Sequence, residues 1–265
     1  MPSPSGRLPG VQMAGFRDRT GDLMDLQAVP YPAVTVVIDL GDGLVVDDGS
    51  GQGKRGGVVA GLAPGRVRGQ GRDVECLQMR LSPVVAHAVL GASSELGGSV
   101  VALNDLWGRD AERLRERLRA TGSWAERFEI AEVELGRRHE TGRAVDPEVA
   151  FAWGQMMATR GRVRVEALAT DLGWSRKRLW SRFRSQVGLT PKRAAQLVRF
   201  DHAAHRLAAG HSAARVAAES GYADQSHLHR DVMAFAGVTP TAVAAAPWLA
   251  VDDVAWASPP HAPKG

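Results

Sequence analysis

Hydrophobic positions follow a period of about two in the first third of the chain and a helical period in the remainder. The runs VTVVIDL, GLVV and GGVVAGL are separated by turns rich in Gly and Asp, and Leu77, Met79 and Leu81 alternate in VECLQMRL. β-branched runs between such turns predict the strands of a small sheet or partial barrel. Residues 1–25 and 247–265 offer little to bury and contain chain breakers, which predicts a disordered tail at each end.

Helical signals follow the predicted strands. Ser82 and Pro83 are typical of a helix start, and Gly91 of its end. A second amphipathic helix is predicted over residues 109–120, and Ser123 with Glu126 forms a capping box for a third. The third helix carries an apolar stripe, which predicts core and leaves a dimer seam as the alternative: Trp124, Phe128, Ala131 and Leu135. Residues 26–140 are therefore predicted to form an N-terminal αβ domain, and residues 141–146 a linker.

The C-terminal part, residues 147–246, is predicted to be entirely helical. Within residues 165–187, Gly173 breaks one apolar helix and Ser175 caps the next. Ala169 lies four residues before the glycine, so that the two helices can cross closely. The second helix has an apolar inner face made of Leu179, Phe183 and Val187. This pattern predicts a helix-turn-helix.

The same pattern recurs over residues 213–235. Ala217 precedes Gly221 by four residues, and Asp224 can cap a helix with the inner face Leu228, Val232 and Phe235. Both units end in a Gly-X-Thr-Pro sequence, at Pro191 and at Pro240. Such a duplication indicates two copies of one structural unit. The predicted fold is α+β, with an N-terminal small sheet or partial barrel and a C-terminal double helix-turn-helix domain.

One continuous helix is predicted between the two copies, from Pro191 to about Ala209. About nineteen residues at roughly 1.5 Å each give a rod of about 28 Å. A rod of this length can hold two helices near one turn of DNA apart, roughly 34 Å, in successive major grooves. The sequence therefore predicts that one chain contacts two adjacent major-groove segments.

Projection at 100° per residue identifies the side chains that face away from the two inner faces. In the first copy these are Lys177, Ser181 and Arg184, flanked by Arg178 and Trp180, and in the second copy Ser226, His227, Arg230 and Met233. Hydrogen bonds from such side chains to base edges, such as those from arginine to guanine, would give a preference for particular DNA sequences.

The stretch from about Val149 to Ala246 resembles the DNA-binding domain of the AraC/XylS family of bacterial transcription regulators, and the run GYADQSHLHRDVMAFAGVTP carries most of the likeness. The resemblance implies a seven-helix domain and base-reading positions at Ser175, Lys177, Trp180 and Ser181, and at Gln225, Ser226, His227 and Arg230. With the neighbouring cations, the candidate DNA-binding residues are Ser175, Arg176, Lys177, Arg178, Trp180, Ser181, Arg184, Gln225, Ser226, His227 and Arg230. Ser181 and the pair Asp231-Val232 depart from the family pattern.

The N-terminal region resembles the half-barrel sensor domain of some members of that family. The resemblance implies effector binding or self-association, so the expected partners are double-stranded DNA, a small-molecule effector, a second copy of the chain and, for an activator, RNA polymerase. No residues fix a ligand, and no cofactor is expected.

The charge distribution agrees with a nucleic-acid partner. Residues 151–246 hold 14 basic and 6 acidic side chains, whereas the whole chain carries a net charge of only +4. A basic module beside a mildly acidic domain is typical of DNA-binding proteins. The single cysteine, Cys76, excludes an intrachain disulfide and a cysteine-based zinc cluster, and the absence of a long apolar run predicts a cytoplasmic protein without membrane contact.

Three local features have competing interpretations. The loop DDGSGQGKRGG suggests phosphate binding, but Asp48 replaces the first glycine of a P-loop and Arg55 its Ser or Thr, so a turn is favoured. His202 and His205 lie three apart but have no third metal ligand nearby, so solvation or packing is favoured. Cys76 lies in an alternating strand, which favours a buried apolar role over a reactive thiol.

Three other functions compete with transcription regulation. An enzyme is disfavoured because no catalytic triad, paired carboxylates or metal triad emerges. A DNA-repair fusion with an alkyl-accepting cysteine cluster is disfavoured by the single cysteine. An interaction protein whose basic domain docks on an acidic partner remains as an alternative, as does a plain helical bundle.

Overall fold

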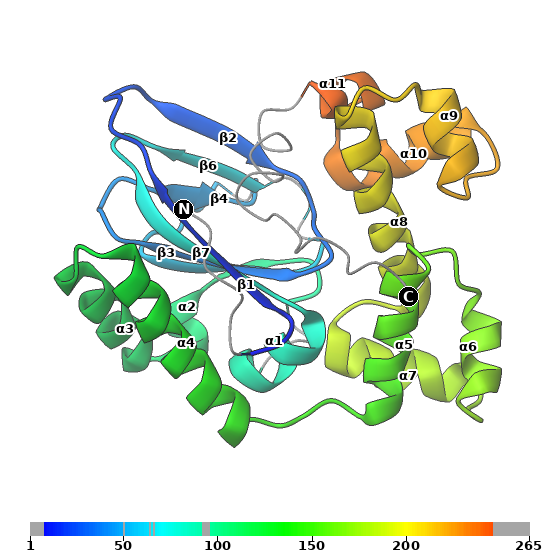
Figure 1. Cartoon of the computed structure of the whole chain (residues 1–265), viewed down its shortest axis with the longest axis horizontal. Coiled ribbons are helices and arrows are strands. Elements are labelled where there is room, and N and C mark those ends of the chain that lie inside the picture. Colours follow the sequence, from blue (N-terminus) through cyan, green and yellow to red (C-terminus); the bar gives the residue numbers. More distant parts are fainter. Residues whose placement is uncertain (1–7, 50, 64, 66, 92–95, 246–265) are drawn as a thin grey trace, which may run out of the picture.

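In the computed structural model, which describes residues 8–49, 51–63, 65, 67–91 and 96–245, the strands form two antiparallel sheets. The five-stranded sheet has the order β1-β7-β3-β5-β8, and the three-stranded sheet has the order β2-β6-β4. Figure 1 shows both on one side of the molecule, in blue and cyan. The strands are β1 (Val11–Arg17), β2 (Met24–Ala28), β3 (Val34–Asp39), β4 (Val45–Asp47), β5 (Gly57–Ala60), β6 (Val67–Gly71), β7 (Glu75–Leu81) and β8 (Val100–Ala102).

The prediction of a disordered tail over residues 1–25 is wrong from β1 onward. β1 pairs along its whole length with β7, and Met13 and Ala14 are buried in this pairing. The partner strand lies about sixty positions further along the chain, so the local composition gives no sign of it. Residues 1–7 and the predicted tail over 247–265 lie outside the described residues.

The N-terminal helices pack against the five-stranded sheet, and three of the four were predicted from the sequence. They are α1 (Pro83–Leu90), α2 (Leu103–Trp107), α3 (Arg109–Ala120) and α4 (Trp124–Thr141). The Ser82 hydroxyl caps α1, and Gly91 ends it with a left-handed φ of 73°. The apolar stripe of α4 is core, because Phe128, Ala131 and Leu135 are buried. Trp124 lies directly over Gly15 of β1, where an added Cβ would collide with the indole ring.

The C-terminal part contains seven helices in the described residues, as predicted. They are α5 (Pro147–Ala158), α6 (Val165–Asp171), α7 (Arg176–Val187), α8 (Pro191–Ala208), α9 (Ala213–Glu219), α10 (Gln225–Ala236) and α11 (Pro240–Ala244). Ser175 and Asp224 cap α7 and α10, and left-handed glycines end them at Gly188 and Gly237. Figure 1 shows α8 joining the pair α6 and α7 to the pair α9 and α10.

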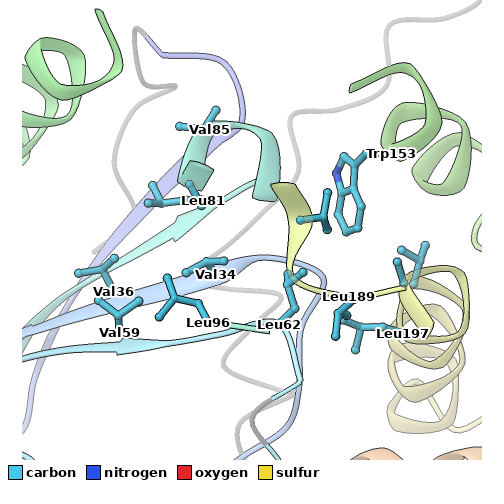
Figure 2. Close-up of a cluster of buried hydrophobic side chains, with 14 of the residues drawn as sticks. Val34, Val36, Val59, Leu62, Leu81, Val85, Leu96, Trp153, Leu189 and Leu197 are labelled. Carbon is cyan, nitrogen blue, oxygen red and sulfur yellow. The ribbon is translucent and has the colours of Figure 1, made fainter. Parts of the chain in front are cut away.

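A single hydrophobic core joins the sheet to the helical part. Figure 2 shows Leu189, which follows α7, between two groups of side chains. Val34 and Leu81 belong to the sheet, and Trp153 and Leu197 belong to α5 and α8. All of these side chains are buried in one cluster. This shared core packs the N-terminal and helical parts against each other, so they are not independent domains joined by a linker.

Candidate nucleic-acid interface

The two helix-turn-helix units have the same turn. Gly173 and Gly221 adopt the left-handed φ values of 62° and 76° that an L side chain rarely adopts. In each turn the residue after the glycine donates its backbone N–H to the carbonyl of the alanine four positions before the glycine. These bonds run from Trp174 to Ala169 at 2.9 Å and from Tyr222 to Ala217 at 3.0 Å. Both alanines are buried. The sequence duplication is thus also a structural duplication.

In each unit the second helix, α7 or α10, holds the position of the recognition helix of a helix-turn-helix. The first of these, α7, buries its inner face and exposes the predicted outer face. Leu179 and Phe183 are fully buried, whereas Lys177 and Ser181 are exposed. Trp180 is also exposed, at 45%, so its ring is available to a partner. The predicted division of α7 into buried and exposed side chains is therefore confirmed.

Three arginines of α7 are held by neighbouring groups of the same unit. The guanidinium of Arg178 lies 4.4 Å from the centre of the Trp174 ring, and that of Arg184 lies 5.2 Å from the centre of the Trp180 ring. Arg176 lies 3.8 Å from the Glu166 carboxylate of α6. The hydroxyl of Ser175 accepts a hydrogen bond from the Arg178 backbone N–H, so that oxygen already caps the helix.

The second recognition helix, α10, exposes Gln225, Ser226 and Arg230. His227 differs from these three because it is half-buried and its ring meets the Tyr222 ring edge-on, at 5.2 Å between centroids. Its backbone N–H donates to the Asp224 carboxylate at 2.7 Å. The most accessible polar residues among the α10 candidates are therefore Gln225, Ser226 and Arg230.

The departure at Asp231 has a structural cause. Its carboxylate accepts a hydrogen bond from Arg199 of α8 at 3.0 Å, and both side chains are largely buried. The Arg199 guanidinium also lies 4.5 Å from the centre of the Tyr222 ring. Burial, followed by the Asp231 charge, raises the pKa of Tyr222 to about 12. Asp231 therefore fixes α10 on the connecting helix and does not face outward.

Both recognition helices touch the N-terminal part with their C-terminal ends. An added Cβ at Gly97 would collide with the backbone of Gly188, which ends α7, and the side-chain amide of Gln27 donates to the Ala236 carbonyl of α10 at 3.2 Å. Figure 1 shows both helices with these ends toward the sheets. The N-terminal halves, which carry most of the candidate contact residues, therefore point away from the N-terminal part.

A further anchor ties α7 to the chain just before α5. Arg182 donates twice to the Asp146 carboxylate, at 2.7 and 2.9 Å, and the Gln186 side chain accepts from the Asp146 backbone N–H at 2.8 Å. The hydrogen bond from Arg182 lowers the pKa of Asp146 below its usual range. The sequence analysis missed this anchor because its partners are far apart along the chain.

A mostly apolar cavity of about 360 Å³ lies between the two sheets and the connecting helix α8. Met24, Leu44 and Val46 are among its apolar lining residues, and Asp201 and Ala204 line it from α8. The guanidinium of Arg80, another lining residue, lies 4.0 Å from the centre of the Tyr31 ring. Alternation along the strands gave no sign of this cavity, because it forms where two sheets face each other.

Cys76 also lines the cavity and is buried. Burial, followed by the charges of Asp39 and Glu75, raises the pKa of its thiol to about 12. The thiol is therefore protonated at neutral pH, which confirms the buried apolar role over a reactive thiolate.

The two remaining local features have structural roles. In the glycine-rich segment, Lys54 pairs with Val46 through a β-bridge, and its ammonium lies 3.8 Å from the Asp48 carboxylate, so this lysine already has partners within the N-terminal part. His205 contacts the Asp201 carbonyl at 2.9 Å. Among the residues that the structure describes, no three His, Cys, Asp or Glu side chains are arranged to hold a metal ion. Nor is any helix in that part of the chain long and apolar enough to cross a membrane.

Comparison with known proteins supports the assignment of the helical part. Residues 168–246 match a family model described as a helix-turn-helix domain. None of the curated proteins matches this sequence. A 1.65 Å structure of ToxT from Vibrio cholerae is similar, with 11% identity, 88% of this chain and 97% of that chain covered, and a TM-score of 0.50. The likeness at this identity is one of fold.

Two further solved structures match with lower TM-scores. One is unsaturated fatty acid bound wild-type ToxT from Vibrio cholerae, with 10% identity, a TM-score of 0.47, and 89% of this chain and 95% of that chain covered. The other is the AraC-like transcriptional activator CuxR, with 15% identity, a TM-score of 0.29, and 68% of this chain and 77% of that chain covered.

Proposed function

We propose that this protein is a sequence-specific transcription regulator of the AraC type, whose two helix-turn-helix units read adjacent major-groove segments. The match of residues 168–246 to a helix-turn-helix family model supports the proposal. The observation that carries the proposal is the repetition of one turn geometry at Gly173 and Gly221, on either side of α8. The 18 residues of α8 span about 27 Å at roughly 1.5 Å each. Successive major grooves on one face of DNA lie roughly 34 Å apart, which the units can match.

Selection of bound duplexes from a random DNA pool by the full chain tests this function. We expect two preferred segments whose centres are about 10 base pairs apart, because both units are held in one chain. A pool without base preference would contradict sequence-specific reading and favour a docking role for the basic surface. Recovery of one segment alone would contradict reading by both units.

We also propose that the cavity between the sheets is the site of a predominantly apolar effector. Its volume of about 360 Å³ lies within the range of small-molecule sites. The same cavity reaches Asp201 and Ala204 of α8, the helix that spaces the two units. A bound molecule would therefore contact the sheets and the spacing helix together.

Replacing Gly69 with valine tests the cavity. Gly69 lies in β6 and lines the cavity, and an added Cβ there would meet only Leu44, at 3.7 Å. The valine side chain is expected to fill part of the cavity without strain, since valine suits a strand. The fluorescent probe N-phenyl-1-naphthylamine should brighten with the unchanged protein and several-fold less with Gly69→Val.

Gln12→Val is the matched control, because Gln12 is exposed on β1 and does not line the cavity. It should bind the probe as the unchanged protein does. Circular dichroism during heating checks that both variants fold. Equal probe fluorescence with a folded Gly69→Val variant would show that the apolar molecule binds elsewhere.

A further inference from the structure

The loop between α5 and α6 concentrates positive charge at the middle of the helical part. It has the sequence TRGRVR over residues 159–164, and Arg160, Arg162 and Arg164 are all exposed. Within the described ranges, no ion pair joins any of the three to a carboxylate. Other exposed arginines, such as Arg182 and Arg215, form ion pairs with Asp146 and Glu219. The loop therefore presents cationic charge that its own surroundings do not neutralise.

The loop is hydrogen-bonded to the end of α5 and lies close against α8. Its backbone donates hydrogen bonds from Arg160 to Met157 at 3.1 Å and from Gly161 to Met156 at 2.8 Å. Gly161 has a φ of 71°, and an added Cβ there would collide with the carbonyl oxygen of Ala195 in α8. This attachment matters because a fixed array of charges loses less conformational entropy on binding than a mobile loop does.

The loop connects the two helix-turn-helix units on the side of their recognition-helix N-termini. The side-chain stem of Arg162 packs on Gly221 in the turn before α10, 3.1 Å from where a Cβ would stand. At its other end the loop leads into α6, whose Glu166 lies 3.8 Å from Arg176 at the start of α7. Figure 1 shows the connection beside α8, between the two units.

The pKa of a neighbouring histidine reflects the positive charge of the arginines around it. The pKa of His202, on α8, is lowered to about 4, first by burial and then by Arg160, Arg206 and Arg162. His202 is therefore neutral at physiological pH and adds no charge of its own. The excess positive charge near the middle of α8 resides on arginines, which stay charged at any working pH.

We propose that the 159–164 loop binds the phosphates of the DNA segment that lies between the two major grooves. This inference rests on the proposed function and adds a contact that depends on the DNA backbone alone. Between two grooves read on one face, the duplex turns its backbone toward the protein, opposite the middle of α8. Arginine pairs with phosphate oxygens through two parallel hydrogen bonds, so each exposed arginine can hold one phosphate.

The experiment compares salt dependence in full-length variants. Arg160→Gln/Arg164→Gln removes two loop charges and leaves Arg162 packed on Gly221. The slope of log Kobs against log salt, measured on the selected duplex, should become shallower by about 1.8, since each phosphate contact contributes about 0.9. Base preference in the selection experiment should not change, because phosphates carry no sequence information.

The matched control is Arg109→Gln/Arg117→Gln, which removes two exposed charges from α3 on the N-terminal part. It should leave the slope within error of that of the unchanged protein. Equal slopes in the loop variant and the control would overturn the proposal. If the unchanged protein shows no DNA binding at all, the proposed function itself is overturned, which the first titration reveals before any variant is made.

A second measurement changes the DNA instead of the protein. Methylphosphonates placed at the central phosphates of the selected duplex remove the backbone charge while the protein stays unchanged. The unchanged protein should bind the modified duplex more weakly than the unmodified one. The loop variant should bind the two duplexes with nearly equal affinity, because it already lacks the contacts to those phosphates. Additive losses from the DNA change and the loop change would show that the loop contacts other phosphates, and would overturn the proposed location.

Discussion

Asp231→Ala is expected to lower the free energy of unfolding by about 3 kcal/mol, the lower end of the cost of breaking a buried ion pair. The side chains of Asp231 and Arg199 are only 10% and 16% exposed, so the substitution leaves the Arg199 guanidinium without its carboxylate in a dry environment. Residual exposure of Arg199 keeps the cost at this lower end. Urea denaturation followed by circular dichroism measures the change.

A double-mutant cycle separates the ion pair from other losses. The double variant Arg199→Met/Asp231→Ala should lose less free energy of unfolding than the two single variants lose in sum, by about 0.5–3 kcal/mol, because it leaves neither charge buried without its partner. Additive single costs would show that the two charges do not stabilise each other. The result matters for DNA binding, since Asp231 fixes the helix that carries Arg230 on its outer side.

Arg230→Ala is expected to weaken binding to the preferred duplex by about 1–3 kcal/mol and to relax base preference at one position. Arg230 is exposed on α10, and its neighbour Asp231 is turned inward to Arg199. An arginine in this position can donate two hydrogen bonds to O6 and N7 of guanine. Fluorescence anisotropy titration, repeated with duplexes changed at single base pairs, measures both effects.

Arg117→Ala is the control for Arg230→Ala. Arg117 is exposed on α3, far along the chain from the recognition helices, so its removal changes the net charge by the same amount. It should leave base preference unchanged. If Arg230→Ala altered affinity no more than this control and kept every base preference, Arg230 would not be a base-contacting residue.

The exposure of the candidate side chains on α7 and α10 was largely predictable, whereas the contacts that they make with neighbouring segments were not. Projection along the helix axis separated Leu179 from Lys177 correctly, because a helix fixes the direction of each side chain. It could not separate His227 from Arg230, since the half-burial of His227 depends on Tyr222 in the preceding turn. Likewise, the interpretation of Asp231 required its partner on α8.

The strands illustrate the same limit at the level of the fold. Val34–Asp39 and Glu75–Leu81 were predictable because their own residues are β-branched or alternate. β1 was assigned to a tail because the first 25 residues offer little to bury and contain chain breakers, whereas its order comes from pairing with β7. A strand with little local signal becomes ordered only when a distant strand supplies its hydrogen bonds.

Local chemistry in the chain was enough to specify the two helix-turn-helix units. Their caps, turn glycines and inner faces act between residues a few positions apart, so each leaves its mark in a short stretch of sequence. The cavity between the sheets, the attachment of both recognition helices to the N-terminal part and the site of the arginine loop were decided only by the folded chain. These features depend on contacts between distant segments, and such contacts follow from how packed surfaces fit together rather than from any local pattern.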